Sequence, residues 1–278
     1  MINKYDSFIF DLDGTVYRGD NIISGADKTI NTLKESGKEI IFISNKTTGT
    51  IREYYTFLKS FGLNIEESEI LNSTYVLKNY LKDNYLHSTF YAIGEEIFIK
   101  EIAEAGLKYS EDPAKIEILL VTLDRTLNYK KLEIAANALE KGARFFAANI
   151  DDTCPVTGGE VLDAGSTISA LEKRTHRKLE LNFGKPSKFM VDEVMKRLSS
   201  DKSKTLLIGD RLETDIAMGN KFGIDTALVS TGVKHYTNGN SEIKPTYYLN
   251  SVADILNKKY PREESPEGMP MAEPLTKR

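Results

Sequence analysis

Two aspartates stand directly after an apolar segment near the N-terminus. Residues 8–10 are Phe-Ile-Phe, and the chain continues as Asp11-Leu12-Asp13-Gly14. Side chains two positions apart in an extended chain face the same way, so the carboxylates of Asp11 and Asp13 can converge on one point. Such a pair can supply a nucleophile, a general acid/base or oxygen ligands for a hard cation. Asp and Gly are also common in plain turns, which would explain this motif alone.

A hydroxyl residue follows a second apolar segment in the same way. Residues 40–43 are Ile-Ile-Phe-Ile, followed by Ser44, Asn45 and then Lys46-Thr47-Thr48 ahead of an expected helix. A hydroxyl group and backbone N–H groups at a strand-to-helix junction can hold an anion. Taken by itself, this segment is better explained as a Ser/Thr/Asn helix cap.

A third apolar segment, residues 206–208, leads through Gly209 to Asp210, and Asp215 follows five residues later. Here again a carboxylate follows an expected strand, although Asp215 alone would also favour the positive end of the helix that it opens. Lys185 lies in a fourth cluster, Gly-Lys-Pro-Ser at 184–187, ahead of another expected helix. An isolated lysine is usually solvated surface.

Together the four clusters supply what phosphoryl transfer to a carboxylate requires. A carboxylate nucleophile such as Asp11 forms an aspartyl-phosphate and divides one displacement into two easier steps. Mg²⁺ would screen the two approaching anions, with Asp11, Asp210 and the backbone carbonyl of Asp13 as oxygen ligands. Lys185 would add a compact positive charge near the phosphoryl oxygens. Asp13 would protonate the leaving alcohol and later activate water.

The elements that position these residues are short apolar runs separated by helix-like segments. This pattern is typical of buried parallel strands joined by crossover helices, so we expect an α/β fold. Ligands of open α/β sheets bind beyond the carboxyl ends of the strands, which would bring the clusters into one crevice. The expected strands are residues 7–10, 40–43, 89–93, 116–121, 144–147, 205–208, 226–229 and 247–249. The expected helices are residues 26–36, 50–61, 97–105, 129–141, 188–198 and 214–222, and all but the fifth end at a glycine.

Composition excludes several classes of protein. The mean hydropathy of −0.35 and the absence of an apolar run of about 20 residues argue against a membrane protein. A net charge of −4 without a Lys/Arg tract argues against an extended nucleic-acid surface. One cysteine, Cys154, and three separated histidines offer neither an internal disulfide nor a zinc cluster. The single cysteine fits a reducing compartment, and without an apolar span or a signal-peptide pattern we expect a cytoplasmic protein. Residues 261–278, rich in Pro and Glu, read as a disordered tail.

The four clusters resemble the motifs of the haloacid dehalogenase superfamily of phosphatases. Its pattern is Asp-x-Asp-Gly-Thr, a Ser or Thr after a strand, a Lys, and Gly-Asp with a second acid downstream, and all four occur here in that order. The longer strings at 11–19, 44–45, 184–187, 209–216 and 230–233 are similar to the NagD-type subgroup, in particular to AraL-type sugar phosphatases. The similarity covers nearly everything except the tail.

This resemblance implies a Rossmann-like parallel-sheet core with an inserted, smaller α/β cap of the C2 type. We place the core at residues 1–84 and 183–260 and the cap at 85–182. It further implies a Mg²⁺-dependent phosphatase of a small phosphorylated metabolite, such as a nucleotide or, as the leading expectation, a sugar phosphate. A homodimer through the cap is also expected. The implied site residues are Asp11, Asp13, Ser44, Asn45, Lys185 and Asp210, with Asp215 in support.

Two departures and two alternatives stay open. Asn149-Ile150-Asp151 has isoleucine where the subgroup has proline, so a substrate role for Asn149 or Asp151 stays open, and a plain turn explains the segment at least as well. Lys46-Thr47-Thr48 departs from the more usual Asn-Ser-Ser, which bears on substrate specificity and leaves Ser44 unchanged.

A phospho-acceptor signalling domain would share the acids and the lysine, but Asp13 and the cap argue against it. A non-catalytic phosphate-binding protein would not need the complete set.

Overall fold

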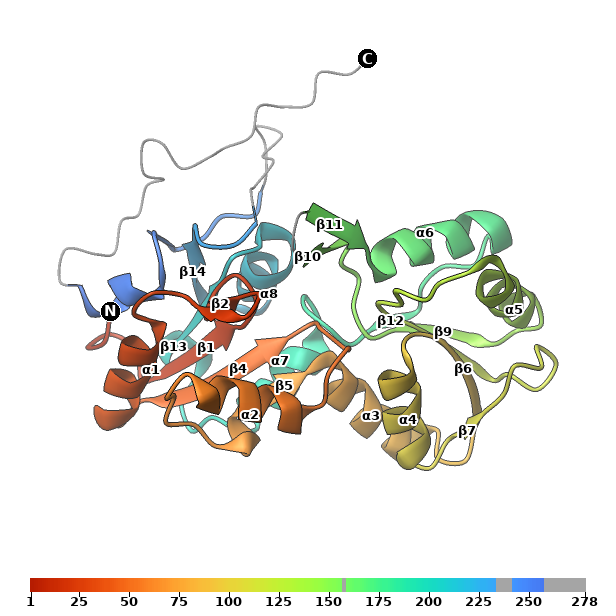
Figure 1. Cartoon of the computed structure of the whole chain (residues 1–278), viewed down its shortest axis with the longest axis horizontal. Helices are drawn as coiled ribbons and strands as arrows, with labels where there is room; N and C mark the ends of the chain where they lie inside the picture. The colour runs from red at the N-terminus through yellow and green to blue at the C-terminus, as the bar shows by residue number, and fades with distance from the viewer. Residues whose placement is uncertain (157–158, 234–241, 258–278) are drawn as a thin grey trace, which may run out of the picture. The chain divides into compact units, whose positions relative to one another are not determined.

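A computed structural model of the chain describes residues 1–156, 159–233 and 242–257 (Figure 1). The tail expected from residue 261 lies outside the described residues. The chain forms two compact units. The first unit comprises Met1–Ser44, Tyr55–Ile70 and the chain from Val191 onward, and the second unit comprises Asn45–Tyr54 and Leu71–Met190.

The first unit is built on a sheet with the strand order β15-β14-β13-β1-β4-β5. Pairing is parallel from β15 through β4. All five residues of β1 and all five of β13 are buried, as expected for central strands covered on both faces. The strands are β1 (Ser7–Asp11), β4 (Glu39–Ser44), β5 (Ile70–Asn72), β13 (Thr205–Gly209), β14 (Asp225–Val229) and β15 (Tyr247–Leu249).

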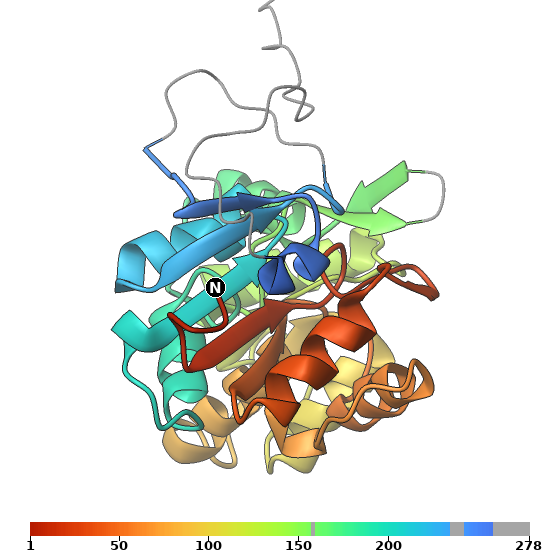
Figure 2. The ribbon, with the colours of Figure 1, turned by 90° about the vertical axis from the view of Figure 1, so that its left-hand side faces the viewer.

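Helices and one short hairpin accompany this sheet. The 3-10 helix Val252–Leu256 packs beside α1 (Ala26–Glu35), as Figure 2 shows. A π-helical turn, Leu212–Ile216, follows β13 and continues into α8 (Ala217–Phe222). The hairpin of β2 (Tyr17–Arg18) and β3 (Asn21–Ile22) follows β1. Two helices, α2 (Ile51–Ser60) and α7 (Lys188–Met195), run across the boundaries between the units in the sequence.

The second unit has its own parallel sheet, with the strand order β12-β9-β8-β6-β7. Figure 1 shows α5 and α6 on one side of this sheet and α3 and α4 on the other. Buried apolar side chains of β6, β8, β9, α5 and α6 form its core. The strands are β6 (Thr89–Ile93), β7 (Lys108–Tyr109), β8 (Ile118–Val121), β9 (Arg144–Ala147) and β12 (Leu181–Asn182). The helices are α3 (Ser73–Asn84), α4 (Glu96–Glu104), α5 (Tyr129–Glu140) and α6 (Ala164–Thr175). An antiparallel hairpin joins β10 (Thr153–Val156) to β11 (Gly159–Leu162).

All eight expected strands are present: three have the expected bounds, and the bounds of the other five differ by one or two residues at an end. All five glycines expected to end helices have φ between 73° and 101°. Two helices were not expected, α3 and α6. Side chains outside these helices supply their N-caps: Asn72 accepts from the backbone N–H of Tyr75, and Asp163 accepts from that of Ala164. Within the described ranges, the helices fall short of the length and apolar character needed to cross a bilayer.

Candidate active site

Three buried carboxylates of the first unit meet at the carboxyl ends of two neighbouring strands. β1 ends at Asp11, and β13 ends one residue before Asp210. Parallel pairing of Phe10 with Ile208 places these two ends side by side. One carboxylate oxygen each of Asp11, Asp210 and Asp215 lies within 4.8 Å of the other two. Their relative exposures are 7%, 2% and 0%, so little water is available to screen their charges.

A bound cation would offset the repulsion among the negative charges of this cluster. Burial raises the pKa of Asp210 well above its ordinary value, and the neighbouring charges of Asp11 and Asp215 raise it further. The opposing contributions, from the Val233 backbone N–H and the Arg211 charge, are smaller. Oxygen ligands held together against their mutual repulsion suit a hard divalent cation. The residues of the cluster therefore fit a site for such an ion.

Asp215 is held beneath the end of β13 by its own turn. Its carboxylate accepts a hydrogen bond of 3.1 Å from the backbone N–H of Arg211. A Cβ atom at Gly209 would lie only 2.2 Å from the Asp215 carboxyl carbon, so only glycine fits at that position. The π-helical turn Leu212–Ile216 thus directs Asp215 back toward Asp210, rather than leaving it as a residue at the end of a regular helix.

Two loops enclose the Asp210 carboxylate. A Cβ atom at Gly232 would lie 1.8 Å from Asp210 Oδ2, and one at Gly14 would lie 2.5 Å from the same atom. Gly14 has a φ of 91°, a left-handed conformation that glycine adopts readily, so the backbone turns sharply after Asp13. Thr231 Oγ1 donates to the Gly14 carbonyl at 2.6 Å, and the Val233 N–H donates to Asp210 Oδ2 at 2.9 Å. The segment 231–233 therefore holds both the turn and the carboxylate.

Asp13 and Ser44 lie at the same edge of this sheet. Asp13 is half-buried just beyond β1, where the Gly14 N–H donates to the Tyr17 carbonyl at 2.7 Å. Ser44 is the last residue of β4 and is 3% exposed. It directly follows Ile43, which pairs with Asp11 across the two strands. The first unit thus brings together five of the expected site residues: Asp11, Asp13, Ser44, Asp210 and Asp215.

Lys185 and Asn45 belong to the second unit and lie against each other there. Lys185 is 2% exposed, so the alternative of a solvated surface lysine is wrong. Its backbone N–H donates to Asn45 Oδ1 at 2.7 Å, and its carbonyl accepts from Asn45 Nδ2 at 3.1 Å. Their expected meeting with the carboxylate cluster stays a prediction.

Polar residues at the carboxyl ends of β8 and β9 form a largely buried hydrogen-bond network. It includes Asn149 and Asp151, for which the sequence left a plain turn and a substrate-binding loop open, and adds Thr122 and Asp163, which the sequence did not indicate. Asn149 Nδ2 donates to Asp151 at 3.1 Å and to Asp163 at 3.0 Å, while its Oδ1 accepts from Thr122 at 3.1 Å. Thr122 in turn shares a hydrogen bond of 2.6 Å with Thr47. Polar groups gather beyond the carboxyl ends of parallel strands, so the position of these residues after β8 and β9 is a sequence signal for this network.

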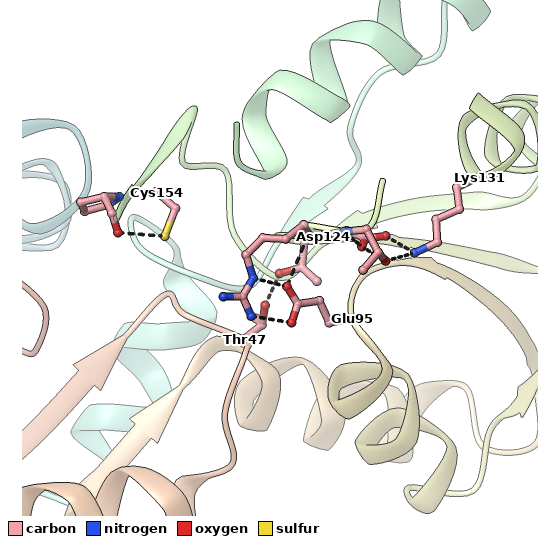
Figure 3. Close-up of polar contacts among 9 residues, drawn as sticks. Thr47, Glu95, Asp124, Lys131 and Cys154 are labelled. Carbon is pink, nitrogen blue, oxygen red and sulfur yellow. Dashed lines mark hydrogen bonds and ion pairs between the residues drawn. The ribbon is translucent and has the colours of Figure 1, made fainter. Parts of the chain in front are cut away.

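Charged pairs extend this edge of the second sheet (Figure 3). Arg125 forms a two-point ion pair with Glu95, with Nε and a terminal nitrogen 2.5 and 2.8 Å from the carboxylate oxygens. This hydrogen bonding to Arg125 lowers the pKa of Glu95. Lys131 Nζ lies 2.5 Å from Asp124 Oδ2. These contacts fix the loops that follow β6 and β8.

Comparisons with known proteins identify the family of the chain. A family model described as haloacid dehalogenase-like hydrolase matches residues 8–108, and a second, described as HAD-hydrolase-like, matches residues 182–255. The chain is 35% identical over 250 residues to the sugar-phosphatase AraL of Bacillus subtilis, an alignment that covers 89% of this chain and 90% of that protein.

Solved structures show the same fold. A p-nitrophenyl phosphatase from Archaeoglobus fulgidus superposes with a TM-score of 0.82 at 32% identity, covering 91% of this chain and 98% of that one. A glycerol phosphate phosphatase from Mycobacterium tuberculosis, solved in complex with magnesium, gives a TM-score of 0.79 at 26% identity, covering 90% and 76%. The expected Rossmann-like α/β core with an inserted cap is thereby confirmed. On sequence, fold and the cluster of buried carboxylates alike, the chain belongs to the haloacid dehalogenase-like hydrolase family.

Proposed function

We propose that the chain is a Mg²⁺-dependent phosphatase that hydrolyses phosphomonoesters of small metabolites through an aspartyl-phosphate on Asp11. The observation that carries this proposal is the buried cluster of Asp11, Asp210 and Asp215 at the carboxyl edge of a parallel sheet. Asp13 and Ser44 at the same edge support it. The related sugar phosphatase and glycerol phosphate phosphatase support the substrate class.

The reaction has two displacements. A carboxylate oxygen of Asp11 attacks phosphorus and forms a new O–P bond, while the bond from phosphorus to the leaving alcohol breaks and Asp13 donates a proton to that alcohol. In the second displacement Asp13 takes a proton from water as the water oxygen attacks phosphorus. The bond to Asp11 then breaks, which releases inorganic phosphate and restores both carboxyl groups to their initial state.

The phosphoryl group requires positive charge and hydrogen-bond donors. Asp11, Asp210 and the Asp13 backbone carbonyl would hold Mg²⁺, with Asp215 supporting Asp210. The ion would screen the charges of the nucleophile and the phosphate. Ser44 would donate its hydroxyl to a phosphoryl oxygen.

Lys185 and Asn45 complete the proposed phosphate site. Lys185 would place its ammonium group near the phosphoryl oxygens, and Asn45 would offer its backbone N–H. We also propose residues 85–182 as the cap that contacts the leaving group, and a sugar phosphate as the physiological substrate.

A phosphatase screen tests this proposal. Purified protein is incubated with p-nitrophenyl phosphate, sugar phosphates, glycerol phosphate, phosphoglycolate and nucleoside monophosphates, with Mg²⁺ and with excess EDTA. We expect catalytic release of inorganic phosphate with Mg²⁺ and loss of at least about 99% of it with EDTA, because charge stabilisation by the ion is worth several kcal/mol. A stable phosphoprotein without turnover would instead favour the phospho-acceptor alternative. No phosphate release from any substrate would reject the phosphatase.

The Gly232→Ala variant tests whether Asp210 is a metal ligand. The new Cβ atom would lie 1.8 Å from Asp210 Oδ2, so the carboxylate must move. We expect the Mg²⁺ concentration for half-maximal activity to rise about tenfold to a hundredfold, the usual cost of disturbing the groups that orient a metal ligand. Stabilisation by Mg²⁺ in thermal unfolding should weaken in parallel.

Gly159→Ala is the matched control for this prediction. Gly159 is exposed, and a Cβ atom there would meet nothing within 4 Å. Its Mg²⁺ dependence should equal that of the wild type. An unchanged Mg²⁺ requirement in Gly232→Ala would count against Asp210 as a ligand.

A further inference from the structure

The side chain of Asn45 pairs with both backbone groups of Lys185. Asn45 Oδ1 accepts from the Lys185 N–H at 2.7 Å, and Asn45 Nδ2 donates to the Lys185 carbonyl at 3.1 Å. Both residues are buried, with exposures of 8% and 2%. Two hydrogen bonds in opposite directions between planar amide groups fix the separation and the orientation of the Lys185 backbone at once.

The surroundings leave little room for this pairing to shift. A Cβ atom at Gly184 would lie 2.6 Å from Asn45 Oδ1 and 2.6 Å from the Ala148 carbonyl, so the close approach depends on glycine. Ser73 Oγ donates to the backbone carbonyl of Asn45 at 2.9 Å. The preceding residue and a neighbouring helix thus confine the pair from two directions.

A carboxylate holds the Asn45 amide in place. Asn45 Nδ2 also donates to Asp151 Oδ2 at 2.9 Å, and Asn149 Nδ2 donates to the same oxygen at 3.1 Å. Hydrogen bonds to a carboxylate are roughly twice as strong as those between neutral groups. Asn149 is anchored in turn by Asp163 and Thr122. Asp151 is half-buried, and the tether rests on a network of hydrogen bonds rather than on one contact.

The number of N–H groups on the Asn45 side chain limits the hydrogen bonds that it can donate to a substrate. A side-chain amide has two N–H hydrogens, and those of Asn45 are directed to Asp151 and to the Lys185 carbonyl. Neither hydrogen remains for an incoming phosphoryl oxygen. Direct recognition of phosphate by this side chain would require one of the two bonds to break inside a buried site, which is unfavourable.

We propose that Asn45 is a positioning residue for Lys185, with Asp151 as its tether. The pairing itself is a property of the second unit, but its catalytic consequence rests on the proposed phosphatase function. Lysine carries its charge on a flexible four-carbon chain, so a fixed backbone narrows the region that Nζ can reach. Misplacing a catalytic group by about 1 Å can cost about a hundredfold in rate.

A second pairing in the chain provides a matched control. Asn220 Nδ2 donates to the Lys244 carbonyl at 2.9 Å, and the Lys244 N–H donates to Asn220 Oδ1 at 2.9 Å. The geometry repeats that of Asn45 and Lys185, but Asn220 and Lys244 are both exposed. Replacing either asparagine by alanine removes two hydrogen bonds to the backbone of a lysine. In Asn45→Ala that lysine is Lys185, and in Asn220→Ala it is Lys244.

The test combines amide hydrogen exchange with kinetics on the full chain. Protein labelled with ¹⁵N-lysine reports the exchange rates of the Lys185 and Lys244 amides. Asn45→Ala should raise the Lys185 exchange rate at least about tenfold and lower kcat for p-nitrophenyl phosphate about tenfold to a hundredfold, with KM nearly unchanged. Asn220→Ala should raise only the Lys244 exchange rate and leave kcat at the wild-type value.

Two variants of Asp151 test the tether. Asp151→Ala should show part of the decrease in kcat seen in Asn45→Ala. Asp151→Asn keeps an acceptor oxygen for the Asn45 amide, so its kcat should be close to that of the wild type.

The amide exchange rates and the kinetic constants together distinguish failure of the positioning role from failure of the proposed phosphatase function. If Asn45→Ala raises KM and leaves the Lys185 exchange rate unchanged, the side chain contacts phosphate directly and the positioning role is wrong. Faster exchange at Lys185 with an unchanged kcat would also overturn it. Inactivity of the wild-type protein would reject the proposed phosphatase, while the exchange rates would still show whether Asn45 fixes the Lys185 backbone.

Discussion

Replacement of Asp11 by asparagine should lower kcat about 10⁴-fold or more, because an amide is a poor nucleophile and a poor ligand for a hard cation. The protein should remain folded. Asp11 is one of three buried carboxylates within 4.8 Å of one another, and its charge helps raise the pKa of Asp210. Neutralising it removes like-charge repulsion, so thermal stability without Mg²⁺ should equal or exceed that of the wild type. Hydrolysis of p-nitrophenyl phosphate and thermal unfolding measure the two effects.

Asp27→Asn is the control for this variant. Asp27 lies in the first turn of α1, half-buried and outside the carboxylate cluster. The loss of its charge near a helix N-terminus should cost only about 0.3–1 kcal/mol of stability and no activity. Substantial turnover by Asp11→Asn would remove Asp11 as the nucleophile, and with it the proposed mechanism.

Asp13→Asn should lower kcat by about 10²- to 10⁴-fold, the usual contribution of a general acid/base. Both displacements should slow, because the asparagine can neither protonate the leaving alcohol nor activate water. With p-nitrophenyl phosphate the first displacement should be less affected, since p-nitrophenolate leaves without protonation. The aspartyl-phosphate should then accumulate. Intact-mass spectrometry after a rapid acid quench would detect the phosphorylated protein.

The double variant Asp11→Asn/Asp13→Asn is the matched control, and it should show no adduct. Asp13 lies just beyond β1, whereas Asp11 belongs to that strand and is more deeply buried. An adduct that persists in the double variant would place the phosphoryl group on another residue. Failure of Asp13→Asn to slow either displacement would require another acid/base.

Much of the fold was predictable because its signals are local. Residues such as Phe8, Phe10 and Phe42 lie in short apolar runs, and each run forms a buried strand. The two unexpected helices had weaker local signals. The sequence of α6, Ala-Gly-Ser-Thr-Ile-Ser-Ala-Leu-Glu-Lys-Arg-Thr, is rich in small polar residues, and packing against α5 and β8 stabilises it. Tertiary contacts overrode a modest helix propensity there.

The carboxylate cluster was predictable for a similar reason. Asp11 and Asp210 each follow a strand in the sequence, and the carboxyl ends of parallel strands meet at one edge of a sheet. The contacts that hold the Asp210 carboxylate in place were not predictable. Gly232 lies far along the chain from Gly14, yet both approach the Asp210 carboxylate. No period or spacing in the sequence indicates which glycine will face which side chain.

By itself, the sequence determined the α/β class, the family and which acids are candidates for the proposed phosphoryl transfer. Each depends on short motifs whose residues lie within a few positions of one another, and on the order of these motifs along the chain. The tertiary structure alone decided that Lys185 is buried and that its backbone pairs with Asn45, 140 positions away in the sequence. It alone also decided that Asp151 and Asn149 brace that pair. Contacts between such distant segments form only when the whole unit packs, so no short stretch of sequence indicates which residues will meet.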